Sequence, residues 1–148
     1  MAFKVRESIT INQSREEVWD YVTEHDEWRR PEIVNVRKLT EGPPGESTRY
    51  EDTAKMMGRE MTIVNEILRF EPPRYLSWTQ VDEGGPTKTV KGSYELKSEN
   101  GGTHFTLYGE YEASGLLKLL VPLIRRQLQK STYPRFLRQL KETLESES

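Results

Sequence analysis

Turn signals interrupt the middle of this chain at short intervals, and they constrain its fold more than any other feature. Clusters of Gly, Pro and Asn, which are typical of tight turns, separate six short segments. The strands predicted between these turns are residues 33–40, 47–56, 60–71, 75–81, 89–97 and 103–113. Because parallel strands need crossovers of about a dozen residues or more, the short connections predict consecutive antiparallel strands.

The chain before these strands has a different pattern. Residues 3–11 alternate apolar and polar side chains, which predicts a half-buried strand and brings the sheet to seven strands. Ser14 and Glu17 have the spacing of a capping box at the start of a short helix. Residues 25–30 indicate a second short helix, which ends at Pro31.

The last part of the chain, residues 116–145, has the one long helical pattern. Its apolar residues lie four apart: Leu120, Ile124, Leu128, Thr132, Phe136, Leu140 and Leu144. Since each step of four advances about 40° beyond a full turn, this row winds around a straight helix. Pro134 cannot donate to the carbonyl of Lys130, so we expect a bend between these residues, whereas Pro122 suits a first helical turn. The predicted fold is α+β, with one domain (residues 1–148) whose sheet curves around a long C-terminal helix.

Composition excludes several classes of protein. Apolar residues make up 34% of the 148 residues, but three Trp, seven Tyr and four Phe supply enough bulk for one core. The absence of cysteine excludes a disulfide scaffold, a zinc–thiolate site and a cysteine nucleophile. The sequence has no apolar run of transmembrane length, and its first residues lack the apolar stretch of a signal peptide. We therefore expect a cytoplasmic protein with no cofactor and no bound metal.

Charge is unevenly distributed along the chain. Residues 1–112 carry 15 Lys and Arg against 21 Asp and Glu, whereas residues 113–141 carry seven basic residues and no acid. The seven are Lys118, Arg125, Arg126, Lys130, Arg135, Arg138 and Lys141. A basic helix on an acidic body indicates an anionic partner such as a membrane surface, and the simpler interpretation is a solvated helix face. Because no aromatic residues interleave the charges, we expect no binding of nucleic acid.

Several stretches of the sequence resemble one known group of proteins. They are ITINQSREEVW at residues 9–19, EGPPGESTRY at 41–50, FEPPRYLSW at 70–78, Gly101-Gly102-Thr103, and the closing Leu137, Leu140, Lys141, Leu144 and Glu145. Together they resemble the START-like, or helix-grip, superfamily, which includes Bet v 1-like pollen allergens and bacterial polyketide cyclase/dehydrase-type (SRPBCC) proteins. The resemblance implies two short helices after the first strand, and a cavity between the concave sheet and the long helix. Members include lipid carriers, hormone receptors and aromatase/cyclases, so the resemblance does not specify one function.

Strand alternation and this resemblance together name the side chains expected to line the cavity. They are Trp28, Tyr50, Met61, Ile63, Trp78, Tyr94, Leu107, Tyr111, Leu120, Ile124 and Leu128. Two runs are expected to share the inward face of neighbouring strands: Phe105, Leu107, Gly109 and Tyr111, and Val90, Gly92, Tyr94 and Leu96. Since a glycine inside a strand packs nothing, Gly92 and Gly109 either hollow the cavity or let the sheet bend.

Few polar residues are expected inside. Glu7 lies on the apolar side of the first strand, so it meets a partner, opens to water at the end of the cavity, or titrates near neutral pH. Asn65 poses the same question on the fourth strand, where apolar residues on both faces leave the inward side open. His25 and His104 are expected at the surface. Trp28 either gates the cavity or caps the core.

These observations favour binding over catalysis. The sequence has no Walker loop and no GxGxxG, HExxH, GxSxG or CxxC motif. We expect a hydrophobic small molecule or lipid to bind in the cavity of a monomer or homodimer. The alternative is an enzyme of the polyketide cyclase/aromatase type, with Glu7 as its candidate catalytic residue. A third hypothesis is a lipid shuttle whose basic helix contacts an anionic membrane surface.

Overall fold

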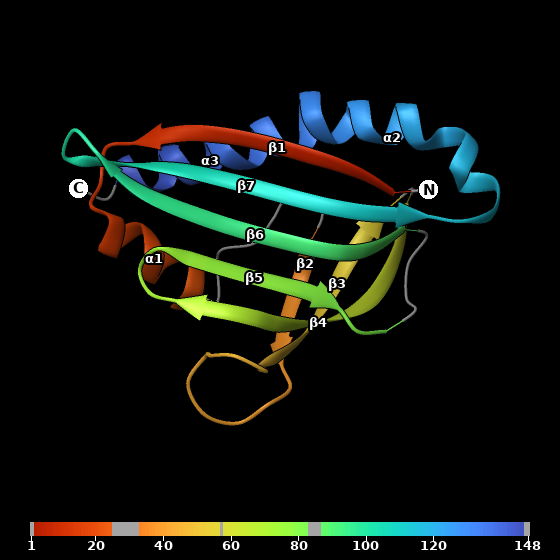
Figure 1. Cartoon of the computed structure of the whole chain (residues 1–148), viewed down its shortest axis with the longest axis horizontal. Coiled ribbons are helices and arrows are strands. Elements are labelled where there is room, and N and C mark those ends of the chain that lie inside the picture. The colour runs from red at the N-terminus through yellow and green to blue at the C-terminus, as the bar shows by residue number, and fades with distance from the viewer. Residues whose placement is uncertain (1, 25–32, 57, 83–86, 147–148) are drawn as a thin grey trace.

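An antiparallel sheet and one long C-terminal helix dominate the computed structural model, which describes residues 2–24, 33–56, 58–82 and 87–146 (Figure 1). The strands are β1 (Ala2–Ile11), β2 (Ile33–Lys38), β3 (Arg49–Met56), β4 (Arg59–Glu71), β5 (Tyr75–Gln80), β6 (Thr87–Glu99) and β7 (Gly102–Ala113). Their order across the sheet is β1-β7-β6-β5-β4-β3-β2, and every neighbouring pair is antiparallel. The predicted seven-stranded antiparallel sheet is confirmed.

One short helix, α1 (Arg15–Glu24), follows β1. Ser14 caps it, because its Oγ accepts a hydrogen bond from the backbone N–H of Glu17 at 3.2 Å. The Ser14 hydroxyl in turn donates to the Glu17 carboxylate, so the expected Ser–Glu pair forms through both side chains. The second short helix, predicted at residues 25–30, lies outside the described residues.

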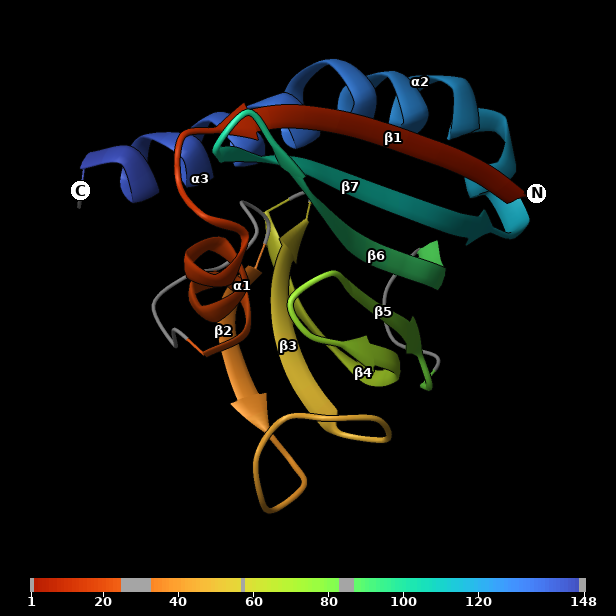
Figure 2. The same cartoon turned by 60° about the vertical axis from the view of Figure 1, so that its left-hand side comes forward.

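The long helix changes its hydrogen-bonding pattern along its length. It consists of the 3-10 segment η1 (Gly115–Leu120), α2 (Val121–Gln127), the π-helical segment η2 (Leu128–Thr132) and α3 (Tyr133–Ser146). The N–H of Tyr133 donates to the carbonyl of Leu128, one residue further back than in an α-helix. Pro134, which has no N–H, follows directly. The bend predicted between Lys130 and Pro134 falls at this π segment, and Figure 2 shows the helix axis changing direction from α2 to α3.

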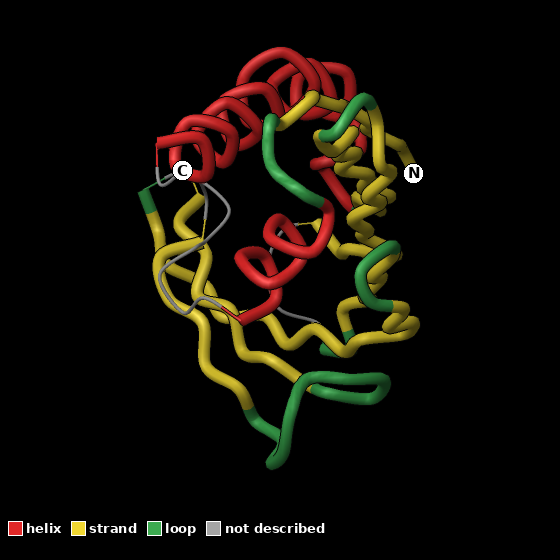
Figure 3. Tube along the Cα trace, turned by 90° about the vertical axis from the view of Figure 1, so that its left-hand side faces the viewer, coloured by secondary structure: helices red, strands yellow, loops and turns green. Residues whose placement is uncertain are grey.

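Seen end on, the sheet curls around the molecule and the long helix runs along its open side, with α1 between them (Figure 3). Among the described residues the long helix lies closest to β1, and α1 lies against β6 and β7. The apolar row of the long helix is buried unevenly: Phe136 and Leu140 are fully buried on α3, Ile124 and Leu128 are half-buried, and Leu120 is exposed. The tightly packed core therefore lies under α3 rather than under the first half of the helix.

No helix in the described part of the chain is both long and apolar enough to cross a membrane.

Candidate functional site

Two rows of side chains cross the inward face of β5, β6 and β7. Leu76, Tyr94 and Leu107 are direct neighbours in the first row, and all three are buried. The ring of Tyr94 also contacts Trp78 and Phe105, with centroids 4.9 and 5.3 Å away. The predicted inward positions of Trp78, Tyr94 and Leu107 agree with this burial.

The second row consists of Trp78 followed by two glycines, Gly92 and Gly109. A Cβ on Gly92 would overlap the indole ring of Trp78, and one on Gly109 would overlap the hydroxyls of Tyr111 and Tyr133. The two glycines therefore make room for aromatic side chains of the protein itself. This is a more specific role than either the hollowing or the bending expected from the sequence.

Val90 does not share this inward face. The pairing of β6 with β7 shifts between Thr89 and Lys91, which places an extra residue in β6. A bulge of this kind reverses the alternation, and Val90 is exposed. The expected inward position of Val90 was wrong for this reason.

The hydroxyl groups of Tyr111 and Tyr133 form a hydrogen bond between β7 and the first turn of α3. Tyr111 is half-buried and was predicted to face inward, whereas Tyr133 is buried and was not predicted. The prediction for the long helix used every fourth residue, which includes Thr132 but not its neighbour Tyr133. The π segment in front of Tyr133 is the feature that turns it inward.

The far side of the sheet, β3 and β4, presents less tightly buried side chains. Trp78 faces inward and pairs with Ile67 on β4, so Ile67 faces inward too. By alternation along β4, the same face carries Asn65, Ile63 and Met61. Tyr50 and Asp52 on β3 are opposite Asn65 and Ile63, so they share this face. Three predicted lining residues, Tyr50, Met61 and Ile63, are half-buried here.

A buried polar pair lies in this part of the sheet. The Asn65 side-chain amide donates a hydrogen bond to the Asp52 carboxylate at 2.8 Å, and both residues are 5% exposed. The other polar atom of Asn65, Oδ1, is buried and has no hydrogen-bond partner among the residues that the structure describes. Asp52 was not predicted as a site residue, because its inward position depends on register with β4. The signal that could have found it is alternation along the strand, because Asp52 lies two residues after Tyr50, which was predicted to line the cavity.

The remaining predicted lining residues lie at different depths. Ile124 and Leu128 on the long helix are half-buried and pack against the core. Leu120 has 40% of its surface exposed, because the 3-10 geometry of η1 does not keep the α-helical spacing on which its prediction depended. Trp28 and His25 lie outside the described residues. His104 is partly exposed on β7, and its Nδ1 lies 3.4 Å from the Glu99 carboxylate.

Glu7 meets a partner on the long helix. The side-chain amide of Gln129 donates to Glu7 Oε1 at 2.5 Å and to the Arg6 carbonyl at 2.8 Å. Glu7 is half-buried on the inward side of β1, and Gln129 belongs to the π segment. Of the three alternatives for Glu7, the structure supports the first, in which a partner satisfies the carboxylate.

The described residues hold no group of three or more His, Cys, Asp or Glu side chains that could bind a metal ion. Tyr108 and Glu145, which lie outside the inward face, have clearly shifted pKa values. Burial and the neighbouring Glu110 raise the pKa of Tyr108. Hydrogen bonds from Lys141 and from the Asn12 backbone lower the pKa of Glu145.

Comparison with solved structures identifies the fold. The protein TTHA0849 from Thermus thermophilus is 20% identical with a TM-score of 0.81, and the match covers 99% of both chains. The Zhui aromatase/cyclase from Streptomyces sp. R1128 is 14% identical with a TM-score of 0.76, over 98% of this chain and 94% of that one. Ginseng major latex-like protein 151 from Panax ginseng is 13% identical with a TM-score of 0.66, over 99% and 97%. The helix-grip fold implied by the sequence is confirmed.

No curated protein sequence matches the chain significantly. A family model does match, over residues 2–145, and its description is polyketide cyclase/dehydrase and lipid transport. Because this match covers nearly the whole chain, the protein belongs to the polyketide cyclase/dehydrase and lipid transport family of the START-like superfamily.

Proposed function

We propose that the protein binds a hydrophobic small molecule or lipid between the concave face of its sheet and its long helix. The observation that carries this proposal is the uneven burial of the inward-facing side chains. Those under α3, such as Phe105 and Leu140, are fully buried. Others, such as Met61 and Ile63 on β4 and Leu128 in the middle of the helix, are half-buried and keep part of their apolar surface accessible. Apolar surface that faces inward and stays accessible is suited to an apolar ligand.

Polar groups on the same face would orient such a ligand. No group in the described part of the chain donates a hydrogen bond to the buried Asn65 Oδ1, and a buried acceptor of this kind gains from a donor supplied by a ligand. Ligand pockets typically combine an apolar lining with a few polar groups in fixed positions. We therefore assign Asn65 as the polar anchor of the proposed site, with Tyr50, Met61 and Ile63 as its apolar neighbours. Trp28 remains part of the proposed lining.

Displacement of the dye anilinonaphthalene sulfonate by oleate tests this proposal. We expect Ile63→Gln to weaken binding by roughly tenfold, because a polar side chain replaces apolar contact surface. The matched control is Leu68→Gln on the same strand, since Leu68 faces outward and is exposed. Equal affinities of the two variants, or no binding of the dye or oleate by the unmodified chain, would contradict the proposal.

A second candidate is an enzyme of the polyketide cyclase/aromatase type that uses the same face. The buried Asp52 carboxylate beside Asn65 favours it, because a buried acid next to a ligand is a candidate proton carrier. Glu7, which Gln129 holds in place, is the second candidate acid. The test is whether the unmodified chain converts a poly-β-ketone substrate. If it does, and Asp52→Asn or Glu7→Gln abolishes turnover but keeps binding, the proposal of catalysis replaces that of binding alone.

A further inference from the structure

Four leucines form an exposed apolar face at the start of the long helix. Leu116, Leu119, Leu120 and Leu123, here called the leucine face, are 85%, 79%, 40% and 65% exposed. Their spacing of three, one and three residues keeps them on neighbouring turns of η1 and α2. Contiguous exposed apolar surface of this kind marks an interaction site more often than isolated exposed residues do.

The opposite side of the same stretch is also apolar. Val121 is buried, and Leu117 and Ile124 pack against the core. These residues hold the stretch on the body of the protein, so the leucine face is not needed for that contact. A helix that is apolar all round is normally buried on every side. Here the outer side is open to solvent.

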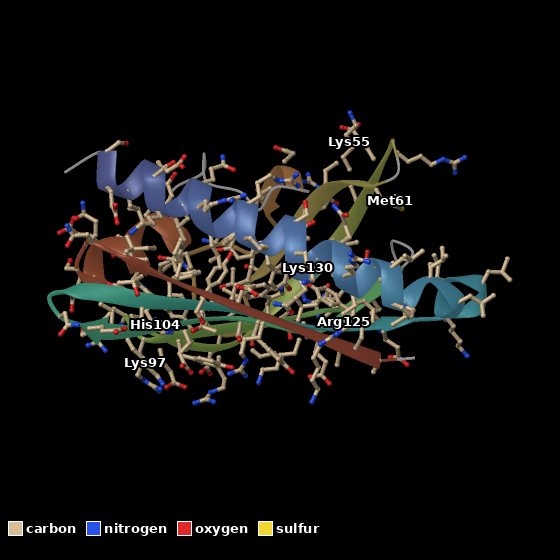
Figure 4. All side chains as sticks on the ribbon, turned by 90° about the horizontal axis from the view of Figure 1, so that it is seen from above. Lys55, Met61, Lys97, His104, Arg125 and Lys130 are labelled. Atoms are coloured by element: carbon tan, nitrogen blue, oxygen red, sulfur yellow. The ribbon has the colours of Figure 1, made fainter. Side chains whose placement is uncertain are left out.

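Four cations lie on the same stretch of helix as the leucine face. Lys118 falls between its leucines in the sequence, and Arg125, Arg126 and Lys130 follow on the next turns; all four are exposed. Arg125 donates from Nε to the backbone carbonyl of Lys4 at 3.1 Å, which holds its charge beside the helix. Figure 4 shows Arg125 and Lys130 along this helix, with Lys97 and His104 toward the other end of the molecule. Residues 113–141 contain no acid, so no carboxylate of this stretch offsets these charges.

We infer that the leucine face docks on the surface of an anionic lipid bilayer. The leucines enter the boundary between headgroups and acyl chains, while Lys118, Arg125, Arg126 and Lys130 reach the lipid phosphates and carboxylates. The positive charge of this stretch of helix favours an anionic membrane over a second copy of the chain as the partner. A second copy of the chain, docked by the same face, would bring two stretches of like charge together, whereas an anionic membrane neutralises them.

Vesicle flotation with the full chain tests this inference. The probes are vesicles of an equimolar mixture of phosphatidylcholine and phosphatidylserine, and vesicles of phosphatidylcholine alone. We expect the unmodified chain to float with the anionic vesicles and to be released by high salt, because salt screens the attraction. The double variant Leu116→Gln, Leu119→Gln and the single variant Arg126→Gln should each weaken binding, the first by roughly tenfold or more.

Matched controls remove the same chemistry from other surfaces. Leu68→Gln replaces an exposed leucine of the sheet, and Lys97→Gln removes an exposed lysine at the other end of the molecule. Both should bind anionic vesicles like the unmodified chain. Failure of the unmodified chain to bind them would overturn the inference, as would equal losses in the control and leucine-face variants. Sedimentation showing a dimer that the double leucine variant dissociates would also overturn it, since the face would then join two copies.

Discussion

The indole ring of Trp78 on β5 occupies the space that a Cβ on Gly92 would need. The two residues are direct partners in neighbouring strands, so the ring lies beside the backbone of the glycine. Trp78 also contacts Tyr94, the second neighbour of Gly92 along β6. From the sequence, Gly92 was expected to hollow the cavity or to let the sheet bend, and in the structure this glycine makes room for the indole ring of Trp78.

Gly92→Ala should therefore destabilise the protein. The added methyl group would displace the indole ring from packed surroundings, which costs about 1–3 kcal/mol of the free energy of unfolding. Gly45→Ala is the control, because a Cβ there would meet no atom within 4 Å and should change stability by less than about 0.5 kcal/mol. Chemical denaturation of both variants measures the difference, and equal stabilities would show that the ring does not depend on Gly92.

The hydrogen bond between Tyr111 and Tyr133 should contribute to the attachment of α3 to the sheet. A double-mutant cycle with Tyr111→Phe and Tyr133→Phe isolates it, since each variant keeps the aromatic ring. We expect a coupling energy of about 1 kcal/mol, typical of a hydrogen bond between neutral groups. Strictly additive effects of the two substitutions on the free energy of unfolding would mean that the hydroxyls do not interact in solution.

Glu145 should make stability depend on pH. Its carboxylate accepts hydrogen bonds from Lys141 Nζ at 2.7 Å and from the Asn12 N–H at 2.8 Å, which lower its pKa in the folded state. Because the unfolded chain then binds a proton more readily, this contribution is complete above the ordinary pKa of a glutamate. It is lost as the pH falls through the lowered value.

Thermal unfolding across this pH range checks the prediction. At neutral pH Glu145→Gln should unfold at a lower temperature than the unmodified chain, and the gap should close in acid. Glu142→Gln, an exposed change on the same helix, should show no such pH-dependent gap. A gap that persists unchanged in acid would mean that the carboxylate charge is not responsible.

The two halves of the long helix should respond differently to loss of a leucine side chain. Leu140 is 0% exposed on α3, so Leu140→Ala should cost about 2–5 kcal/mol of the free energy of unfolding. Leu123 is 65% exposed, so Leu123→Ala should change stability by less than about 0.5 kcal/mol. Similar losses would show that the leucine face is packed in solution and is not free for a partner.

Local chemistry explains why the strands could be predicted. Pro72-Pro73 lies between β4 and β5, and Asn100-Gly101 lies between β6 and β7. These residues favour turns by their backbone geometry alone, so they mark where the strands on either side end and begin. Alternation placed Tyr94 and Leu107 correctly because β6 and β7 pair regularly there. The same rule failed at Val90, where the pairing shifts by one residue and no local signal announces the shift.

The polar part of the candidate site depends on long-range pairing and was largely missed. Apolar residues on both faces of β4 concealed the inward position of Asn65, which only its register with β5 reveals. The partner of Glu7 is Gln129, 122 positions away, and nothing around Glu7 points to it. Tyr133 turns inward because a π segment precedes it, a change of helical geometry that a fixed spacing does not include.

Native mass spectrometry of the chain, purified without denaturation and incubated with oleate, tests the central claim most directly. We predict a one-to-one complex that the Leu68→Gln variant forms equally well and the Ile63→Gln variant forms roughly tenfold less. Loss of the complex in Ile63→Gln alone would place the ligand against the inward face of β4. If the chain carries no hydrophobic molecule after purification and takes up no oleate on incubation, the claim that this protein binds a hydrophobic ligand is contradicted.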